Sequence, residues 1–276
     1  MSTAELIIEA GPRPRLRQAL RELWAYRALV LAFAERNIRV MYKQAVLGIA
    51  WAVIQPLAFM TVFTLTLGRL AKVPGGGVPY AAFALSALTG WTFLQSAVSF
   101  GANALLSDGA LVRKVYFPRE IPIFGAILAS GLDFGIALVL FAIVGPFLGA
   151  HPSPVWLIAP LLGVVLALLA AGVALTTAAL NVYYRDFRYA LPFMLQLWLF
   201  ASPVAYPLSV VPKAWRGLYV GLNPAAGVLD AFRNVLALGR SPDLPLLALS
   251  VGVAVVLATI GYRIFKRLEP GFADVV

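Results

Sequence analysis

The sequence predicts an all-α integral membrane protein with six membrane-spanning helices. Hydrophobic residues make up 61% of its 276 residues and charged residues only 12%, whereas about 25% of the residues in a typical soluble domain are charged. The apolar residues also gather in runs close to the roughly 20 residues that a helix needs to cross a bilayer. Together these features exclude an ordinary soluble domain.

The N-terminal region, residues 1–44, is rich in basic residues, and we expect it to form an amphipathic helix on the cytoplasmic face of the membrane. Leu16 and Leu20 recur at helical spacing, and Glu35 precedes Arg39 by four residues, which is a favourable helical pair. A solvated charged tail is the alternative interpretation of this region.

The first two spans are expected at about residues 45–68 and 79–100, separated by a Gly/Pro turn. Pro56 predicts a kink in the first of them. One helical face of this span combines aromatic rings with an amide: Trp51, Gln55, Phe59 and Phe63.

A polar loop is expected at residues 101–120, with a turn at Ser107, Asp108 and Gly109. The third span, about 121–148, contains Asp133 between Gly131 and Gly135, a glycine pair that allows close helix approach. A carboxylate inside the membrane either marks an ion pathway or is a structural group bonded within the bundle. We favour the structural interpretation of Asp133, because the sequence suggests no second titratable partner for it in the spans.

The fourth span, about 155–180, is rich in small residues, and the fifth follows a charged group made of Arg185, Asp186 and Arg188. Residues 189–205 carry no charge. One face of this fifth span again combines aromatics with an amide: Tyr189, Phe193, Gln196 and Phe200. For either span alone, packing is the simpler explanation of such a face, but its repetition in two spans suggests a lining that grips a carbohydrate.

Residues 206–238 do not fit another span. Asn223 and Pro224 predict a helix start, and Gly239 predicts its end. The helix between them would be roughly 22 Å long, shorter than a hydrocarbon core of about 30 Å. We therefore expect an outer re-entrant or surface-lying helical hairpin here, followed by a last span at about 244–263 and a cytoplasmic tail at 269–276.

The charge distribution predicts the topology. Most of the 22 basic residues fall in segments that lie on one side if both termini are cytoplasmic, which favours N-in and C-in by the positive-inside rule. The net charge of +10 does not indicate nucleic-acid binding, because the basic residues flank spans instead of forming one patch.

The sequence gives no sign of catalysis by this chain alone. It has no cysteine, and its single histidine, His151, cannot supply a histidine metal cluster. A phosphate-binding loop of the GxxxxGK[ST] type is also missing. We therefore expect neither a bound metal nor a bound cofactor.

Several segments in consistent order resemble the polysaccharide-export permeases of the ABC transporter superfamily, which export O-antigen, capsule or teichoic acid chains. The resemblance runs from about residue 16 to 268 and is carried by YKQAVLGIAWAVIQPL (42–57), LVRKVYFPREIP (111–122), NVYYRDFR (181–188), WLFASPVAYP (198–207) and GLNPAAGVLDAFRNVL (221–236). The motif YRDF tilts the expected substrate towards O-antigen or teichoic acid.

The resemblance implies a homodimer in the bacterial inner membrane, served by two ATPase subunits that bind ATP and magnesium. Residues 45–268 would be the transmembrane domain, with the coupling loop at 101–120 (Ser107, Asp108, Gly109, Arg113 and Lys114) and the periplasmic gate at 206–238. The aromatic faces of spans one and five would line the channel. At the cytoplasmic entrance, the phosphate of a lipid-linked glycan would meet basic side chains: Arg36, Arg39, Lys43, Arg113 and Lys114.

The sequence leaves open the role of one charged group and the exact class of the protein. The charged group at 185–188 either locks the end of the fifth span or contacts substrate. Within the ABC class, a lipid or drug exporter is the second reading. A secondary transporter would need a coupling-ion site and usually internal repeats, and neither is visible; a membrane scaffold would not need a matched coupling loop.

Overall fold

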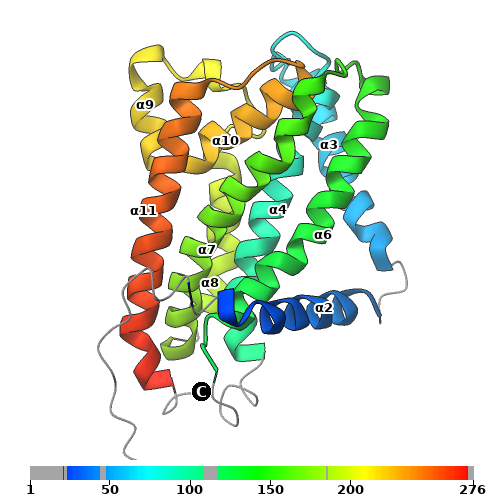
Figure 1. Cartoon of the computed structure of the whole chain (residues 1–276). Helices are drawn as coiled ribbons and strands as arrows, with labels where there is room; N and C mark the ends of the chain where they lie inside the picture. Colours follow the sequence, from blue (N-terminus) through cyan, green and yellow to red (C-terminus); the bar gives the residue numbers. More distant parts are fainter. Residues whose placement is uncertain (1–20, 22–23, 44–47, 108–116, 185, 273–276) are drawn as a thin grey trace, which may run out of the picture.

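The protein is a bundle of long helices. The computed structural model describes residues 21, 24–43, 48–107, 117–184 and 186–272, and every regular element in those ranges is helical (Figure 1). Five segments are long and apolar enough to cross a membrane: Trp51–Leu70, Tyr80–Ser107, Ile121–Val144, Pro154–Tyr183 and Leu244–Gly271. The all-α membrane class is therefore confirmed, with five candidate spans.

Helix α2 (Arg27–Lys43) lies across the lower end of the bundle, where the long helices end (Figure 1). It packs on α6 (Ile121–Val144) at Gly125, where an added Cβ would lie only 2.6 Å from the Cβ of Phe33. The expected pair between Glu35 and Arg39 is present on the exposed side of α2. A helix lying across the spans suits the expected interfacial position.

The first candidate span is α3 (Trp51–Phe63), which follows a 3-10 turn, η1 (Gly48–Ala50), and continues into a π-helical segment, η2 (Thr64–Leu70). Pro56 lies inside α3, as expected. The chain then turns through a glycine-rich stretch in which Gly76 and Gly77 have positive φ angles of 68° and 109°.

Helix α4 (Tyr80–Ser107) is the central helix of the bundle and packs against both α6 and α7 (Ala159–Tyr183). Its 28 residues correspond to about 42 Å, so it extends beyond a hydrocarbon core of about 30 Å. The expectation that residues 101–107 belong to a loop is therefore wrong, because α4 continues through them.

Helix α6 is followed by two 3-10 turns, η3 (Pro146–Leu148) and η4 (Pro154–Ile158), that lead into α7. Helix α7 meets the last span, α11 (Leu244–Leu268), at an especially close contact. A Cβ on Gly261 would lie 2.2 Å from the carbonyl oxygen of Gly172. By contrast, added Cβ atoms on Gly131 and Gly135 would meet nothing within 4 Å. The close approach expected at Gly131 and Gly135 is thus not made to any other part of the described structure.

Helix α8 (Asp186–Ala201) has 16 residues, or about 24 Å, and contains Pro192. After it come a 3-10 turn, η5 (Leu208–Val210), then α9 (Lys213–Leu222), α10 (Pro224–Phe232) and the π-helical η6 (Arg233–Ala237). These elements lie at the upper end of the bundle, with α10 inserted against α4, α7 and α11 (Figure 1). Helical structure from Pro224 to Ala237 and a φ of 60° at Gly239 match the expected helix boundaries.

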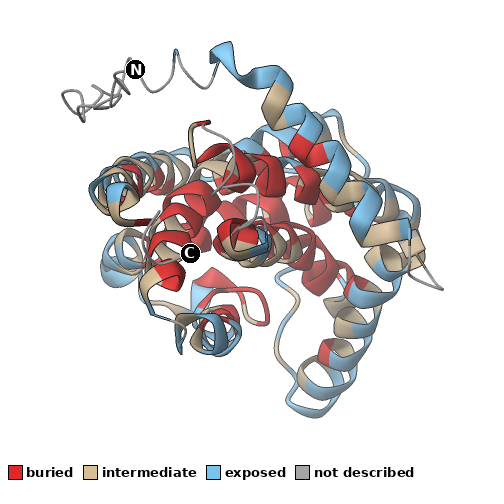
Figure 2. Cartoon of the chain, turned by 90° about the horizontal axis from the view of Figure 1, so that it is seen from below, coloured by how far each residue is buried: buried red, intermediate tan, exposed pale blue. Residues whose placement is uncertain are grey.

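The core lies in the middle of the bundle (Figure 2). It is built from α4, the inner faces of α6 and α7, and nearly all of α10. Helix α7 contributes a row of fully buried alanines spaced four residues apart: Ala170, Ala174 and Ala178. The outer faces of α3, α8 and α11 are largely exposed in a single copy of the chain.

Candidate functional site

The aromatic face of α3 is only partly exposed. The side chain of Trp51 is 54% exposed, and Gln55 beside it is exposed as well. Phe59 is partly buried and its ring lies 6.2 Å from that of Phe63, which is buried in the core. Three of the four expected lining residues are therefore at least partly exposed, whereas Phe63 is buried and packs against Phe59.

The aromatic face of α8 is exposed along its whole length. Tyr189, Phe193 and Phe200 are 79%, 64% and 54% exposed, and Gln196 is also exposed. The opposite face of α8 is buried through Leu191, Leu195 and Leu199, spaced four residues apart. The burial of these leucines turns the rings and the amide outward.

The two aromatic faces come from helices with different neighbours. Helix α3 packs against α4 and α6, whereas α8 packs against α4 and α7. Within one chain the α8 face and the exposed part of the α3 face are thus open surfaces, each with aromatic rings and one amide. Such surfaces are large apolar areas with a few hydrogen-bonding groups, the combination expected of a wall that contacts a ligand with both C–H faces and hydroxyls.

The basic residues expected at the entrance divide into two sets. Arg36, Arg39 and Lys43 are all exposed on α2 at the lower end of the bundle. Arg36 lies over the Phe33 ring at 4.7 Å and donates a hydrogen bond to Asn37. Arg113 and Lys114, together with Asp108 and Gly109, lie outside the described residues, while Ser107 is the last residue of α4.

Asp133 has a partner from another helix. The hydroxyl of Tyr42, one residue before the end of α2, donates a hydrogen bond to the Asp133 carboxylate on α6. Burial and this hydrogen bond raise the pKa of Tyr42, so its hydroxyl stays protonated. The contact ties α2 to α6, which is what the structural interpretation of Asp133 requires.

A buried ion cluster at the lower end was not anticipated from the sequence. Lys266 on α11 donates to Glu120 at 2.8 Å and to Glu269 at 2.9 Å. The Glu120 side chain is fully buried, and burial raises its pKa against the opposing effect of Lys266. A polar loop at residues 101–120 would place Glu120 in water, and this part of the expectation is wrong, because Lys266 in the last turn of α11 pairs with the buried Glu120.

The neighbours of this cluster bring together three chain segments. Arg119 donates to the carbonyl of Glu269 at 2.7 Å, and its guanidinium lies 5.8 Å from the ring of the fully buried Phe272. Tyr183, at the end of α7, donates to the carbonyl of Leu268. The start of α6 and the ends of α7 and α11 are thus joined at the C-terminal end of the segment expected to couple to an ATPase, residues 101–120.

At the upper end, Arg233 in the expected outer hairpin is buried, with 3% exposure. Its guanidinium lies 3.7 Å from the centre of the Phe83 ring and donates to the carbonyl of Pro203 at 2.6 Å. Asp230 lies 3.6 Å away as its counter-charge. Burial lowers the pKa of Arg233 to about 10, so the group remains charged at neutral pH. The sequence signal that could have predicted this contact is an arginine within an otherwise apolar helical segment.

Asn223 precedes α10, but its side chain makes no capping hydrogen bond to that helix. It accepts a hydrogen bond from the indole of Trp198 at 2.8 Å and donates to Ser202 at 2.9 Å. Asn223 therefore holds the end of α8 against the start of α10.

The charged group before α8 is only partly described. Asp186 begins α8 and Arg188 follows, both exposed, whereas Arg185 lies outside the described residues. Tyr184 has an extended backbone with φ of −128° and ψ of 104°, so α7 ends here and α8 begins as a separate helix.

A bundle of helices, five of them long and apolar enough to cross a bilayer, defines an integral membrane protein. The sequence pattern of the family described as ABC-2 type transporter matches residues 28–237. The chain belongs to this family.

Its relatives include an O-antigen export system permease protein RfbA from Myxococcus xanthus, which is 30% identical over 92% of this chain and 98% of the relative. A protein of the same name from Klebsiella pneumoniae is 22% identical, over 90% of this chain and 95% of the relative. A probable doxorubicin resistance ABC transporter permease protein DrrC from Mycobacterium tuberculosis is 28% identical over 77% of this chain and 80% of the relative.

Proposed function

We propose that this chain is the permease subunit of an ATP-driven exporter that moves a lipid-linked polysaccharide of the O-antigen type out of the cytoplasm. The observation that carries the proposal is the pair of outward aromatic faces on α3 and α8, each with a glutamine among the rings. Similarity to the Myxococcus RfbA over nearly the full length of both chains supports the substrate class.

The aromatic faces suit a sugar polymer because of their chemistry. An aromatic ring stacks against the C–H face of a sugar without selecting one sugar, and an amide bonds hydroxyls of any orientation. A wall of this kind holds a chain weakly at many points, so the polymer can slide. A wall of leucines would offer no partner for the hydroxyls, which would remain desolvated at a cost.

In the proposed assembly, two copies of the chain place their α3 and α8 faces around one channel. Each copy crosses the membrane six times, with α8 as the additional, shorter span and α9 and α10 as an outer gate hairpin. Both termini lie in the cytoplasm, on the inner side of the bacterial plasma membrane. Two separate ATPase subunits bind ATP and magnesium and act on residues 101–120.

The entrance lies at the lower end, beside α2. Arg36, Arg39 and Lys43 there offer charge-assisted hydrogen bonds to the phosphates of the lipid carrier. Arg113 and Lys114 complete this basic set in the proposal. Since α2 is tied to α6 through Tyr42 and Asp133, the entrance and the coupling region are mechanically connected.

The test is polysaccharide export in a strain that lacks its own permease. Replacing Trp51, Phe59, Phe193 and Phe200 together by Ala should reduce the exported polymer by at least tenfold while the protein still reaches the membrane. A matched control replaces four exposed apolar residues elsewhere, namely Phe147, Leu157, Leu161 and Val164. If both quadruple variants export equally, the channel assignment is wrong.

A lipid or drug exporter is the second candidate, favoured by the similarity to DrrC. Such a protein would carry a small amphiphile through a local site and would tolerate the four aromatic substitutions. Export of the polymer without transport of small amphiphiles would identify the polysaccharide as the substrate.

A further inference from the structure

The open side of the central helix α4 is polar along its lower half. From residue 92 to the end of the helix, the positions that are not buried recur three or four residues apart, so they form one strip along α4. Only two of these eight positions are apolar, Phe100 and Leu106. The other six carry hydrogen-bonding side chains and are called the polar strip here: Thr92, Gln95, Ser96, Ser99, Asn103 and Ser107.

The open sides of other spans have a different composition. The large exposed side chains of α6 and α11 are apolar, among them Leu128, Leu132, Val255 and Ile260. A surface in contact with lipid tails is expected to resemble these, because a polar group placed in hydrocarbon without a partner costs free energy. The polar strip is therefore unsuited to face lipid.

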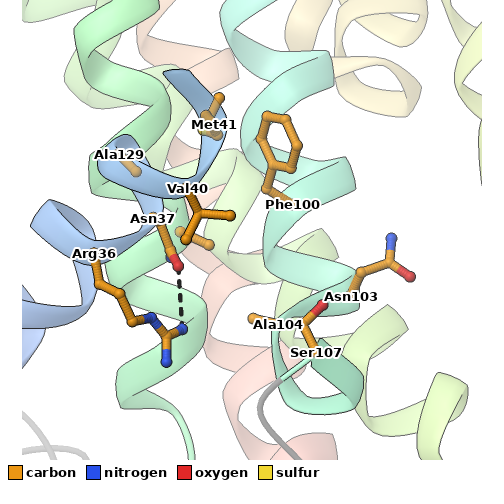
Figure 3. A pocket seen from close by; sticks show the side chains of 10 residues that line it. Arg36, Asn37, Val40, Met41, Phe100, Asn103, Ala104, Ser107 and Ala129 are labelled. Atoms are coloured by element: carbon orange, nitrogen blue, oxygen red, sulfur yellow. Dashed lines mark hydrogen bonds between the residues drawn. The ribbon is translucent and has the colours of Figure 1, made fainter. Parts of the chain in front are cut away.

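The polar strip lies between the helices that carry the two aromatic faces. Helix α4 packs against both α3 and α8. One edge of the strip adjoins Trp91, whose ring lies 5.8 Å from that of Trp198 on α8. At the other edge, Phe100 lines a pocket that α4 forms with α6 and with α2, the helix that precedes α3. Asn103 points away from α2 (Figure 3), so the strip faces the side between these two edges.

The side chains of the polar strip retain hydrogen-bonding capacity. Gln95 accepts a hydrogen bond from the Trp91 indole at 2.8 Å, but its amide nitrogen has no acceptor among the described residues. Asn103 donates to the carbonyl of Ser99 at 2.8 Å, and the Thr92 hydroxyl donates to the backbone of the preceding turn. In the described part of the chain, these bonds all stay within α4. The amide of Gln95 therefore needs water or a ligand hydroxyl as its acceptor.

We propose that the polar strip of α4 lines the lower half of the channel and hydrogen-bonds the hydroxyls of the passing glycan. This role rests on the proposed function and adds a third wall to the channel. The rings of α3 and α8 contact the C–H faces of the sugars, whereas the strip exchanges hydrogen bonds with their hydroxyls. Hydroxyl and amide side chains both donate and accept, so the strip bonds hydroxyls without selecting one sugar.

Polar residues on a membrane helix also serve as contacts to another helix. A second copy of the chain that covered the polar strip would be the rival explanation. The two explanations differ in whether water reaches the strip, which a charged thiol reagent measures directly.

Single introduced thiols can report this access, because the chain contains no cysteine. We would compare S96C and S99C with L128C on α6 and A97C on α4, in membrane vesicles that contain the permease together with its ATPase subunits. Leu128 is 47% exposed and lies two turns from the lower end of its helix, as Ser99 does. Ala97 is fully buried.

The reagent is the membrane-impermeant sulfonatoethyl methanethiosulfonate. S96C and S99C should react about tenfold faster than L128C and A97C or more, because the reactive thiolate forms in water and is disfavoured in hydrocarbon or in the core. The proposal is overturned if S96C and S99C react no faster than the two controls, since the strip would then be covered by another helix or by lipid.

A second pair of variants tests the hydrogen bonds themselves. Threonine and valine have nearly the same shape, so S96V with S99V and S96T with S99T differ only in the two hydroxyls. At equal amounts in the membrane, the Thr variant should export about three times as much polymer as the Val variant or more, because the Val variant loses two partners for sugar hydroxyls. Equal export by the two variants also overturns the proposal.

These results are separate from those of the aromatic variants. If the quadruple aromatic variant exports normally while the Val variant does not, the aromatic lining is wrong and the polar strip stands. If the aromatic variant loses export while the Val and Thr variants export equally, the strip is wrong and the proposed function stands.

Discussion

Lys266 and Glu120 form a buried ion pair at 2.8 Å although 146 positions separate them in the sequence. Glu120 is the residue before α6, and Lys266 lies in the last turn of α11. The pair therefore fixes the end of the last span against the C-terminal end of the expected coupling loop, residues 101–120.

Lys266→Met should lower the free energy of unfolding by about 3 kcal/mol or more, because it leaves the Glu120 carboxylate buried without a counter-charge. Thermal unfolding of the detergent-solubilised protein, followed by tryptophan fluorescence, measures the loss. The double variant Lys266→Met with Glu120→Gln should recover part of it. Arg263→Met, an exposed position on the same helix, is the control. Equal losses for Arg263→Met and Lys266→Met would contradict the role of the pair.

Arg233→Met should destabilise the upper end by about 2–4 kcal/mol, because the carbonyls of Pro203 and Val204 lose their donor and Asp230 loses its counter-charge. Limited proteolysis of the 202–212 segment and thermal unfolding both measure this change. The exposed Arg240, replaced by Gln, should leave both unchanged. Unaltered proteolysis in Arg233→Met would show that the arginine does not hold the turn.

Gly261→Ala should disrupt the contact between α7 and α11, because the new methyl group would lie 2.2 Å from the carbonyl oxygen of Gly172. We expect a loss of about 1–3 kcal/mol in the free energy of unfolding. Gly252→Ala on the same helix meets nothing within 4 Å and should be neutral or slightly stabilising. A comparison of the two melting temperatures tests the contact, and a Gly261→Ala protein as stable as Gly252→Ala would refute it.

Asp133→Asn should keep polysaccharide export close to the unmodified level, because an amide oxygen still accepts the hydrogen bond from Tyr42. Asp133→Leu should leave the Tyr42 hydroxyl without its acceptor and lower the free energy of unfolding by about 1–3 kcal/mol. Export assays in cells and unfolding of the purified protein separate the two effects. Abolished export in Asp133→Asn with unchanged stability would instead indicate an ion or proton pathway.

Hydrophobic runs, together with the prolines and glycines at their ends, were enough to predict most of the helices. The positions of the long helices, the start at Pro224 and the stop at Gly239 follow from local chemistry, because proline and glycine restrict or release the backbone wherever they occur. The sequence was less informative about the end of α4, residues 101–107, where Gly101, Asn103 and Ser107 suggested a loop but packing against neighbouring helices holds a helix. Asn181 of α7, for example, donates to the carbonyl of Ala102 there.

The contacts between distant residues could not be predicted in the same way. Gly131 and Gly135 have the spacing of a packing motif, yet the close approach occurs at Gly172 and Gly261, which lie on different helices and form no local pattern. Likewise, Phe63 shares its helical face with Trp51 but is buried in the core, whereas Trp51 is 54% exposed. The ion pair between Glu120 and Lys266 depends only on how the helices pack in three dimensions.

The turn that follows α8 has an unusual property: its main-chain oxygens are bound by side chains from elsewhere. Tyr219 and Asn223 donate to the carbonyl of Ala201, Arg233 to those of Pro203 and Val204, and Tyr80 to that of Ala205. A non-helical stretch is tolerated in hydrocarbon only if its polar groups are already satisfied. This reversal of direction can therefore lie below the headgroups, without water, and the short α8 need not reach the far surface.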